Sequence, residues 1–466
     1  MAIVLALLCA AQFMVVLDVS VVNVALPSIQ GALAVDPRGL AWVGNAYALT
    51  FGGLLLLGGR LADLYGHRRV FATGLAVFTA ASLAGGLADT SGLLIAARAG
   101  QGIGAAILAP ATLTVLTSAY PEGPRRTRAI AVWTAVSLAG GTAGNLIGGA
   151  LTQYLSWRSV LLVNVPIGLA CLAAARRIPA GPGRSGTRPD VLGALTATGG
   201  LAALAYGVSG SPVVVAAGCV LLGVSALVQA RASAPLIPYA LVRARAIRLG
   251  NAAMLLAGAC LNPMWYFLTL SMQHVLGYGP LATGLAFLPH TVLTMLVGLR
   301  VTPWLMRRAG DRVLIAAGAL IGAAGFLWQS RIAPGGDYVT AVLGPAVLIS
   351  LGGGLLNTPL TVTVTSGVAP ENAGAASGLM NTAKQAGGAL GLAALVALTA
   401  GPDSGDPVGL AEGYGRAFVL IAAMMAGVAA LALALPDRRD RAPADADADA
   451  DEPATGDEPA GQEHAR

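Results

Sequence analysis

Apolar residues along this chain form long, nearly uninterrupted runs instead of the alternating or one-sided patterns of a soluble domain. Runs of about 20 residues recur from residue 2 to about residue 435, and charged residues or glycine and proline separate them. A helix of about 20 residues crosses the ~30 Å hydrocarbon core of a bilayer. Because backbone groups in lipid must be hydrogen-bonded within the protein, repeated runs of this length predict a helical bundle and not a barrel.

The breaks between the runs define fourteen transmembrane helices. We predict them at residues 2–27, 40–59, 70–88, 93–118, 129–153, 159–175, 190–207, 212–230, 249–273, 282–301, 312–331, 338–360, 374–400 and 414–435. The first run has no basic segment at its start and no evident cleavage site, so we interpret it as a retained span and not as a signal peptide.

A weak internal repeat divides these spans into two halves. RLADLYGHRR follows span 2 and WLMRRAGDR follows span 10, and their alignment places Gly66 on Gly310 and Arg68 on Arg312. Spans 7 and 8 are then an insertion between two six-span halves, a known transporter plan. The predicted fold is an all-α integral membrane protein with two pseudo-symmetric six-helix bundles and two inserted central helices. Its parts are an N-terminal bundle at 1–176, a linker with two additional helices at 177–248, a C-terminal bundle at 249–435 and a disordered acidic tail at 436–466.

Positive charge alternates from loop to loop. Arginines concentrate in the loops after spans 2, 4, 6, 8, 10 and 14; the loop after span 12 is weakly charged, and the intervening loops carry almost no positive charge. Cytoplasmic loops are enriched in Lys and Arg, so the even-numbered loops and both termini are predicted to be cytoplasmic. We expect a multi-pass protein of a bacterial cytoplasmic membrane.

Composition supports the membrane assignment and argues against a nucleic-acid partner. Hydrophobic residues make up 56% of the chain and charged residues only 11%, compared with about 25% charged residues in a soluble domain. The net charge of +6 combines ten acidic residues and four arginines in the tail with 24 basic and 12 acidic residues elsewhere. That positive excess belongs in loops beside the bilayer, so we expect no nucleic-acid partner. The tail cannot bury enough apolar surface to fold.

Cofactor chemistry has no support in the sequence. The four cysteines lie in separate apolar runs without metal-ligand spacing, and no nucleotide-binding P-loop is present. We therefore expect free thiols, no metal and no other cofactor.

Three charged residues lie deep within predicted spans. Asp18 is the only charged residue between Ala2 and Ile29, and Arg98 lies in span 4. At 1.5 Å per residue, Asp18 lies about 12 Å and Arg98 about 8 Å below the outer surface, so both fall in one layer. A charge in the membrane is costly, so Arg98 must either find a partner in the protein or reach the outer interface. Lys384 lies about 15 Å from the cytoplasmic end of span 13, near the midplane.

Glycines and further polar residues in the spans are candidates for interior surfaces. Gly140, Gly144 and Gly148 recur every fourth residue in span 5, beside Gly149, so one face of this helix allows close packing. His290, well inside span 10, either packs as a satisfied polar residue or relays a proton. The candidate cavity residues are Asn23, Gln101, Asn145, His290 and Lys384.

Several of these segments resemble the motifs of a known family. GGRLADLYGHRRV at 58–70 is similar to the loop between spans 2 and 3 of the major facilitator superfamily. LDVSVVNVALPSI in span 1 resembles the first-span motif of its fourteen-span drug:proton antiporter branch. LLIAARAGQGIGAAILAP, WRSVLLVNVPIG and MNTAKQAGGALG resemble the branch in spans 4, 6 and 13, and the last has Lys384 where arginine is more usual. The resemblance extends from about residue 10 to residue 435.

The resemblance implies roles for two further groups of residues. The loop after span 2 would be a cytoplasmic gate in which glycines permit tight turns and an aspartate caps a helix or pairs with arginine; otherwise it is an ordinary arginine-rich loop. The gate residues would be Gly59, Asp63, Gly66, Arg68 and Arg69. In span 5 the family has an antiporter motif with Gly-Pro before the last glycine pair. Asn145 replaces that proline, which removes an expected kink.

The expected function is secondary active transport. The resemblance implies alternating access between spans 1–6 and 9–14, with export of a small lipophilic compound in exchange for protons. Asp18 is the candidate proton-binding group, and movement of Arg98 would change its affinity for a proton. The charge balance favours neutral or weakly charged substrates such as antibiotics.

Other classes of function stay open at this point. A proton-coupled or facilitative importer of a small metabolite would use the same fold. A membrane receptor or an integral-membrane enzyme is the third class, but the spans contain no paired catalytic carboxylates, histidine cluster or nucleophile elbow, and we expect no enzyme. We expect a monomer in the lipid bilayer, with the substrate and protons as its other partners.

Overall fold

The computed structural model describes residues 2–120, 123–178, 190–208, 210–232, 236–366, 368–369, 372–399 and 406–435. Nearly all of these residues are helical, and no β-strand occurs among them. The predicted acidic tail, 436–466, lies outside the described residues.

The first six spans are long helices joined by short turns. They are α1 (Ala2–Leu33), α2 (Pro37–Tyr65), α3 (His67–Gly86), α4 (Ser91–Ala119), α5 (Pro124–Tyr154), and a sixth span made of α6 (Ser159–Leu162), α7 (Asn164–Ala174) and a 3-10 turn (Ala175–Arg177). Asp36 caps α2 by accepting a hydrogen bond from Gly39 N at 2.9 Å. Thr90 caps α4 in the same way through Leu93 N at 3.3 Å. Local capping therefore fixes where these helices begin.

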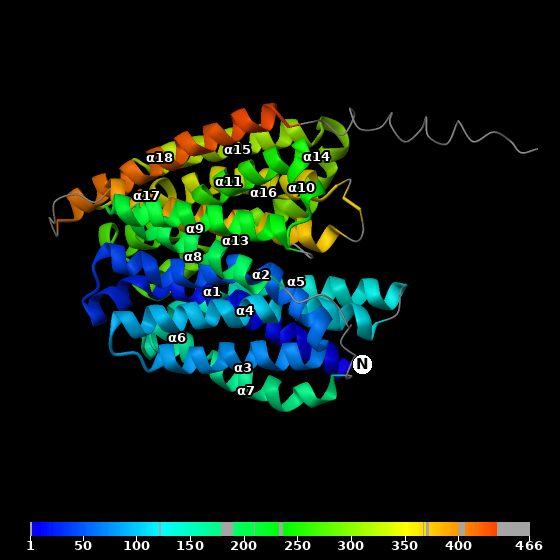
Figure 1. Cartoon of the computed structure of the whole chain (residues 1–466). Helices are drawn as coiled ribbons and strands as arrows, with labels where there is room; N and C mark the ends of the chain where they lie inside the picture. The colour runs from blue at the N-terminus through cyan, green and yellow to red at the C-terminus, as the bar shows by residue number, and fades with distance from the viewer. Residues whose placement is uncertain are drawn as a thin grey trace, which may run out of the picture.

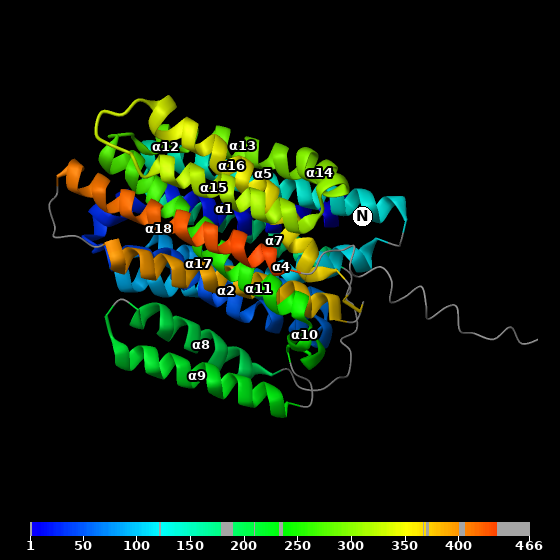
Figure 2. The same cartoon turned by 90° about the horizontal axis from the view of Figure 1, so that it is seen from above.

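Two inserted helices and one short helix follow. They are α8 (Val191–Gly207), α9 (Pro212–Arg231) and α10 (Tyr239–Arg243). α8 and α9 pack against each other as a hairpin, which lies to one side of the other helices (Figure 2). Glycines allow the close approach, since a Cβ at Gly218 of α9 would lie 2.9 Å from Leu204 N of α8.

The last six spans contain more interruptions. They are α11 (Arg245–Leu270) with a π-helical segment (Ser271–Val275); α12 (Pro280–Ala286), α13 (Leu288–Leu296), a π-helical segment (Val297–Val301) and α14 (Thr302–Ala309), which together form one broken span; α15 (Asp311–Gln329); a π-helical segment (Val339–Leu343) with α16 (Gly344–Thr365); α17 (Ala373–Thr399); and α18 (Pro407–Leu433). Pro289 near the start of α13 accounts for the break after α12, because proline lacks the N–H that would continue the helix.

These helices correspond to all fourteen predicted spans. Within the described residues, twelve helices are long and apolar enough to cross a membrane. The remaining two predicted spans also correspond to helices. α8 is apolar but has only 17 residues; α17 has 27 residues and is therefore long enough, but it is not among those twelve apolar helices. The prediction of an all-α membrane protein is therefore confirmed.

The helices before and after the hairpin form two bundles (Figure 1). In the first bundle α1 packs against α5, α2 against α4, and α3 against α4 and α7; in the second, α11 packs against α17 and α18, and α15 against α16 and α18. The turns that the internal repeat aligns have the same unusual backbone, with φ of 86° at Gly66 and 78° at Gly310. Positive φ favours glycine. The matching turns support the pseudo-symmetry of the two bundles.

The bundles contact each other through α1, α2 and α5 on one side and α11, α12 and α17 on the other. The Thr382 hydroxyl of α17 donates a hydrogen bond to Gly52 O of α2 at 2.6 Å. The Gln273 amide, just after α11, donates to Val24 O of α1 at 2.9 Å. Backbone carbonyls thus supply part of the contact between the bundles.

Gly58, and not Gly59, is the glycine of α2 that close packing requires. A Cβ at Gly58 would lie 2.0 Å from Ala106 O of α4, whereas at Gly59 the nearest atom, Pro110 Cβ, would be 3.8 Å away. The predicted tight turn at Gly59 is wrong, because this residue lies inside α2 and the chain turns only at Gly66.

We expect Gly58→Ala to lower the free energy of unfolding by about 1–3 kcal/mol, the usual cost of overpacking, because α2 and α4 must move apart. Gly59→Ala is the matched control and should stay within about 0.5 kcal/mol of the parent protein. Thermal unfolding of the purified protein in detergent micelles measures both changes. Equal stability of the two variants would contradict the close approach of the helices.

Candidate functional site

A buried ion pair joins α1 and α4 in the N-terminal bundle. Arg98 Nη1 pairs with Asp18 Oδ2. Asp18 is 0% exposed and Arg98 is 2% exposed. Of the two predicted alternatives for Arg98, the structure shows pairing within the protein and not extension to the outer interface.

Neutral side chains complete the coordination of the carboxylate. Gln101 Nε2 and Asn164 Nδ2 both donate to Asp18 Oδ1, at 2.8 and 2.7 Å. Gln101 also accepts a hydrogen bond from Arg98 Nη1 at 2.8 Å and contacts Ser82 Oγ, to which its Nε2 donates at 2.8 Å. Both carboxylate oxygens therefore have donors, as a buried charge requires. The network connects α1, α3, α4 and α7.

Arg98 stands between this carboxylate and the middle of the molecule. Its Nε donates to Val43 O of α2 at 3.0 Å, and its guanidinium carbon lies 4.6 Å from the centre of the Tyr47 ring, a cation–π contact. The Tyr47 hydroxyl is buried without a hydrogen-bond partner in the described part of the chain. Arg98 and Tyr47 line the central cavity, whereas Asp18 does not. Arg98 is thus the residue that both lines the cavity and pairs with Asp18.

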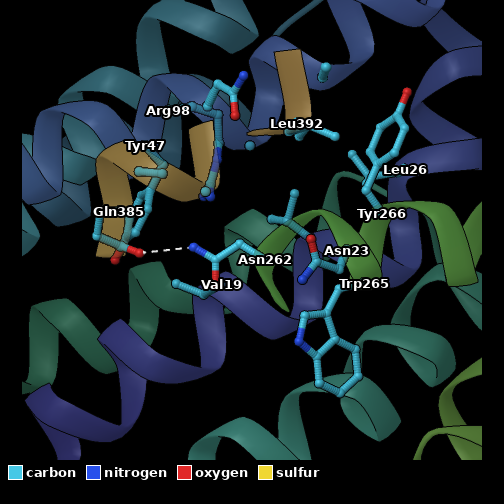
Figure 3. A pocket seen from close by; sticks show the side chains of 16 residues that line it. Val19, Asn23, Leu26, Tyr47, Arg98, Asn262, Trp265, Tyr266, Gln385 and Leu392 are labelled. Atoms are coloured by element: carbon cyan, nitrogen blue, oxygen red, sulfur yellow. Dashed lines mark hydrogen bonds between the residues drawn. The ribbon is translucent and has the colours of Figure 1, made fainter. Parts of the chain in front are cut away.

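The central cavity lies between the bundles, and α1, α2, α11 and α17 form most of its wall (Figure 3). Its volume of about 110 Å³ has room for several water molecules. Trp265 and Tyr266 of α11 provide aromatic surface, and the polar surface includes the amides of Asn23, Asn45, Asn262 and Gln385. Asn262 Nδ2 donates to Gln385 Oε1 at 3.3 Å. Among the described residues that line this cavity none is acidic, and Arg98 is the one that is charged.

The predicted cavity residues separate into different environments. Asn23 lines the central cavity, while Gln101 belongs to the Asp18 network. Asn145 lies where α5 meets α12, because a Cβ at Gly284 would be 2.4 Å from Asn145 O. Its side-chain oxygen is buried and unpartnered within the described residues. α5 continues as one helix through this position, as expected without the family's proline.

His290 and Lys384 differ in how well their polar groups are satisfied. His290 Nδ1 lies 2.8 Å from Ser350 Oγ, and the His290 ring packs edge-on against Trp265 with 5.1 Å between ring centres. His290 thus has the contacts of a packed polar residue one layer behind the cavity wall. Lys384 is half-buried beside Gln385 and takes part in no ion pair or hydrogen bond in the described structure.

The glycines of α5 contact two different helices. A Cβ on any of Gly140, Gly144 and Gly148 would lie within 3.1 Å of an atom of α1. A Cβ at Gly149 would instead lie 2.6 Å from Pro280 O of α12. Three of the predicted glycines therefore hold α1 against α5 within one bundle, and the fourth permits contact between the bundles.

The predicted gate loop forms the short turn between α2 and α3. Gly66 both ends α2 and begins α3, Arg68 is half-buried and Arg69 is exposed. The Asp63 side chain lies outside the described part of the structure. The loop is thus a tight connection with arginine at its surface.

Sequence reasoning did not identify Asn164, Ser82, Asn262 or Gln385. Asn164 lies in the WRSVLLVNVPIG segment, and an amide in so apolar a span was the available signal. Asn262 and Gln385 come from distant spans, and only the packing of α11 against α17 shows that they meet.

A many-helix membrane protein with two pseudo-symmetric halves, a cavity between them and a buried ion pair beside it has the architecture of a secondary transporter. The chain belongs to the Major Facilitator Superfamily, whose sequence pattern matches residues 8–392. The protein is therefore a multi-pass membrane transporter and not an enzyme.

Three relatives that align with most of the chain are named as antibiotic export or resistance proteins. The cephamycin export protein CmcT of Amycolatopsis lactamdurans is 56% identical, over 93% of this chain and 92% of the relative. The puromycin resistance protein pur8 of Streptomyces alboniger is 40% identical, over 94% and 92% of the two chains. The methylenomycin A resistance protein of Streptomyces coelicolor is 32% identical, over 82% of both.

Solved transporter structures share the fold. The nucleoside transporter NupG matches with a TM-score of 0.68 at 13% identity, over 93% of this chain and 99% of that protein. An auto-inhibited POT family peptide transporter matches with a TM-score of 0.68 at 15% identity, over 92% and 96%. At this identity the likeness concerns the fold alone.

Asp18 and Arg98 should depend on each other for stability. Arg98→Gln leaves a buried carboxylate without its counter-ion and is expected to lower the free energy of unfolding by about 3–5 kcal/mol. The double variant Asp18→Asn/Arg98→Gln removes both charges and should be more stable than Arg98→Gln alone. Arg300→Gln, which removes an exposed arginine, is the control. Chemical unfolding in detergent micelles measures the stability of Asp18→Asn, Arg98→Gln and the double variant. If the effect of the double variant equals the sum of the two single effects, the coupling is contradicted.

Proposed function

We propose that this protein exports a small lipophilic antibiotic in exchange for protons, by exposing the central cavity alternately to the two sides of the membrane. The observation that carries the proposal is the buried Asp18–Arg98 pair next to that cavity. The similarity to antibiotic export and resistance proteins supports the outward direction.

Asp18 is the proposed proton-binding group. When ionised, its carboxylate accepts hydrogen bonds from Arg98, Gln101 and Asn164. Protonation removes the charge that holds Arg98 and leaves a guanidinium without a counter-ion at the cavity wall, which is unfavourable in a dry interior. A conformation in which Arg98 finds other partners or water then becomes favoured, so proton binding shifts the population of states.

The two bundles are the proposed moving parts. We assign residues 1–176 to one and 249–435 to the other, joined by 177–248. Motion between them would change the contacts of α2 with α17 and of α5 with α12, where glycines permit close approach. The turn with Gly66, Arg68 and Arg69 would act as a gate at the cytoplasmic side, to which the charge distribution also assigns both termini.

Proton entry can supply the necessary energy. One positive charge that crosses a potential of 100 mV releases about 2.3 kcal/mol. Since about 1.4 kcal/mol corresponds to a tenfold concentration ratio, one proton per uncharged substrate supports a gradient of roughly 50-fold. A pH gradient adds to this value.

We expect Asp18→Asn to lower proton-driven efflux at least tenfold, because an amide cannot take up and release the coupling proton. The assay is movement of puromycin and of a cephamycin in proteoliposomes with an imposed proton gradient. Substrate exchange without net proton movement should persist, which shows that the variant is folded and binds substrate. Asp337→Asn, in an exposed loop carboxylate, is the control. Full proton-driven efflux by Asp18→Asn would exclude Asp18 as the coupling site, and uptake in place of efflux would favour an importer.

A further inference from the structure

We propose that Lys384 binds the anionic group of a lipophilic organic acid in the central cavity, so that the substrates of this transporter include carboxylates. The inference rests on the proposed export function and specifies the substrate class of its cavity. It departs from the preference for neutral substrates that charge balance in the sequence favours.

The charges deep within the described spans do not cancel. Asp18 and Arg98 neutralise each other, and Lys384 is left without an ion pair or hydrogen bond among the described residues. Lys384 lies eleven residues after Ala373, where α17 begins, and well before its end at Thr399. A lysine inside a membrane costs about 2.5–3.5 kcal/mol on insertion scales, and such residues mark ligand pathways. A bound anion would provide the missing counter-charge.

Lys384 is placed beside the cavity wall. Its neighbour Gln385 lines the cavity, as does Gly388 one turn further along α17. The Lys384 backbone meets α11 at Gly258, where a Cβ would lie 2.2 Å from Lys384 O. Asn262 of the cavity wall follows Gly258 by one helical turn. The flexible four-carbon stem of lysine can carry its ammonium group from this seam toward a ligand in the cavity.

The cavity wall suits a lipophilic acid. It contains four side-chain amides, and α11 adds two aromatic side chains. No acidic residue is among its described lining residues. Gln385 Oε1 accepts a hydrogen bond from Asn262, while the Gln385 Nε2 donor makes no hydrogen bond within the described structure and is available to an oxyanion. Trp265 and Tyr266 can contact the apolar part of the ligand. A cationic substrate would meet the unpaired charge of Lys384, with no acidic residue among the described lining residues to offset it.

In the proposed exchange cycle the substrate anion would bind Lys384 and not Arg98. Exchange requires the substrate to bind after Asp18 has released its proton. In that state Arg98 is held by Asp18, Gln101 and Val43. Of the two cations in or beside the described cavity wall, Lys384 is then the one without a partner, and it would bind an oxyanion as a point charge without a fixed geometry.

Binding to the full-length protein in detergent micelles tests the proposal. Trp265 lies in the cavity wall, so quenching of tryptophan fluorescence can report the titration. The probes are a β-lactam carboxylate and its uncharged methyl ester. The carboxylate should saturate the signal and bind at least tenfold more tightly than the ester. Equal binding of acid and ester, or no saturable binding of the acid, would overturn the proposal without reference to any variant.

Substitutions locate the charge that is responsible. Lys384→Gln should weaken binding of the carboxylate at least tenfold and leave the ester unchanged, whereas Lys384→Arg should retain the preference for the acid. Arg300→Gln removes an exposed positive charge and should bind both probes like the parent protein. Undiminished carboxylate binding by Lys384→Gln would rule out this lysine.

Transport of the same probes separates this inference from the proposed function. Proton-driven efflux of uncharged antibiotics without any preference for acids would overturn the anion site and leave export intact. Selective carboxylate binding without proton-driven transport would support the anion site and contradict export.

Discussion

A carboxylate and a guanidinium that are both removed from water destabilise a fold unless each has its full set of partners. Both carboxylate oxygens of Asp18 accept hydrogen bonds in a network that extends over four helices of one bundle, and Arg98 donates through Nε and Nη1. The geometry of that bundle follows from this constraint. α1 must hold its carboxylate against α4 and α7, and the glycines of α5 let the backbone of α1 approach closely on its other side. The ion pair is thus both the chemical centre of the bundle and a condition on its packing.

The two bundles share a topology but contain different chemistry. The N-terminal bundle encloses the paired charges, whereas the polar groups of the C-terminal bundle include His290 with Ser350 and the half-buried Lys384, which has no ion pair among the described residues. Arg98 lines the cavity between them on the N-terminal side, and the hydrogen-bonded pair Asn262–Gln385 lines it on the C-terminal side. In the proposed cycle a change of charge at Asp18 alters the N-terminal wall, and the C-terminal wall holds the substrate. Proton binding and substrate binding would then occur on different walls of the cavity and would be coupled through the conformation of the protein instead of through direct contact.

The sequence was sufficient for the membrane architecture because bilayer thickness fixes the length of each span. It also placed Asp18 and Arg98 at one depth, since helical rise converts residue number into distance along the membrane normal. Rotation about a helix axis is harder to infer, because it depends on the neighbouring helices. For this reason the sequence did not reveal that Gly58, and not Gly59, makes the close contact with α4. It also did not reveal that Gln385, and not Lys384, is part of the cavity wall. The roles of the gate and coupling residues remain predictions that rest on the family resemblance and on this geometry.

The inserted hairpin has a further consequence for any motion of the bundles. α8 packs against both α2 and α17, which belong to different bundles. One apolar cluster joins all three helices through Leu49, Ala205 and Ala389. Alanines alternate with larger side chains such as Trp42 at this seam, and a Cβ at Gly53 of α2 would lie 2.2 Å from a side-chain oxygen of α8. The leucine and tryptophan side chains of this seam must therefore change their contacts when the two bundles move relative to each other. Since α8 contacts both bundles, any motion between them in the proposed cycle has to alter the contacts of the hairpin with at least one of them.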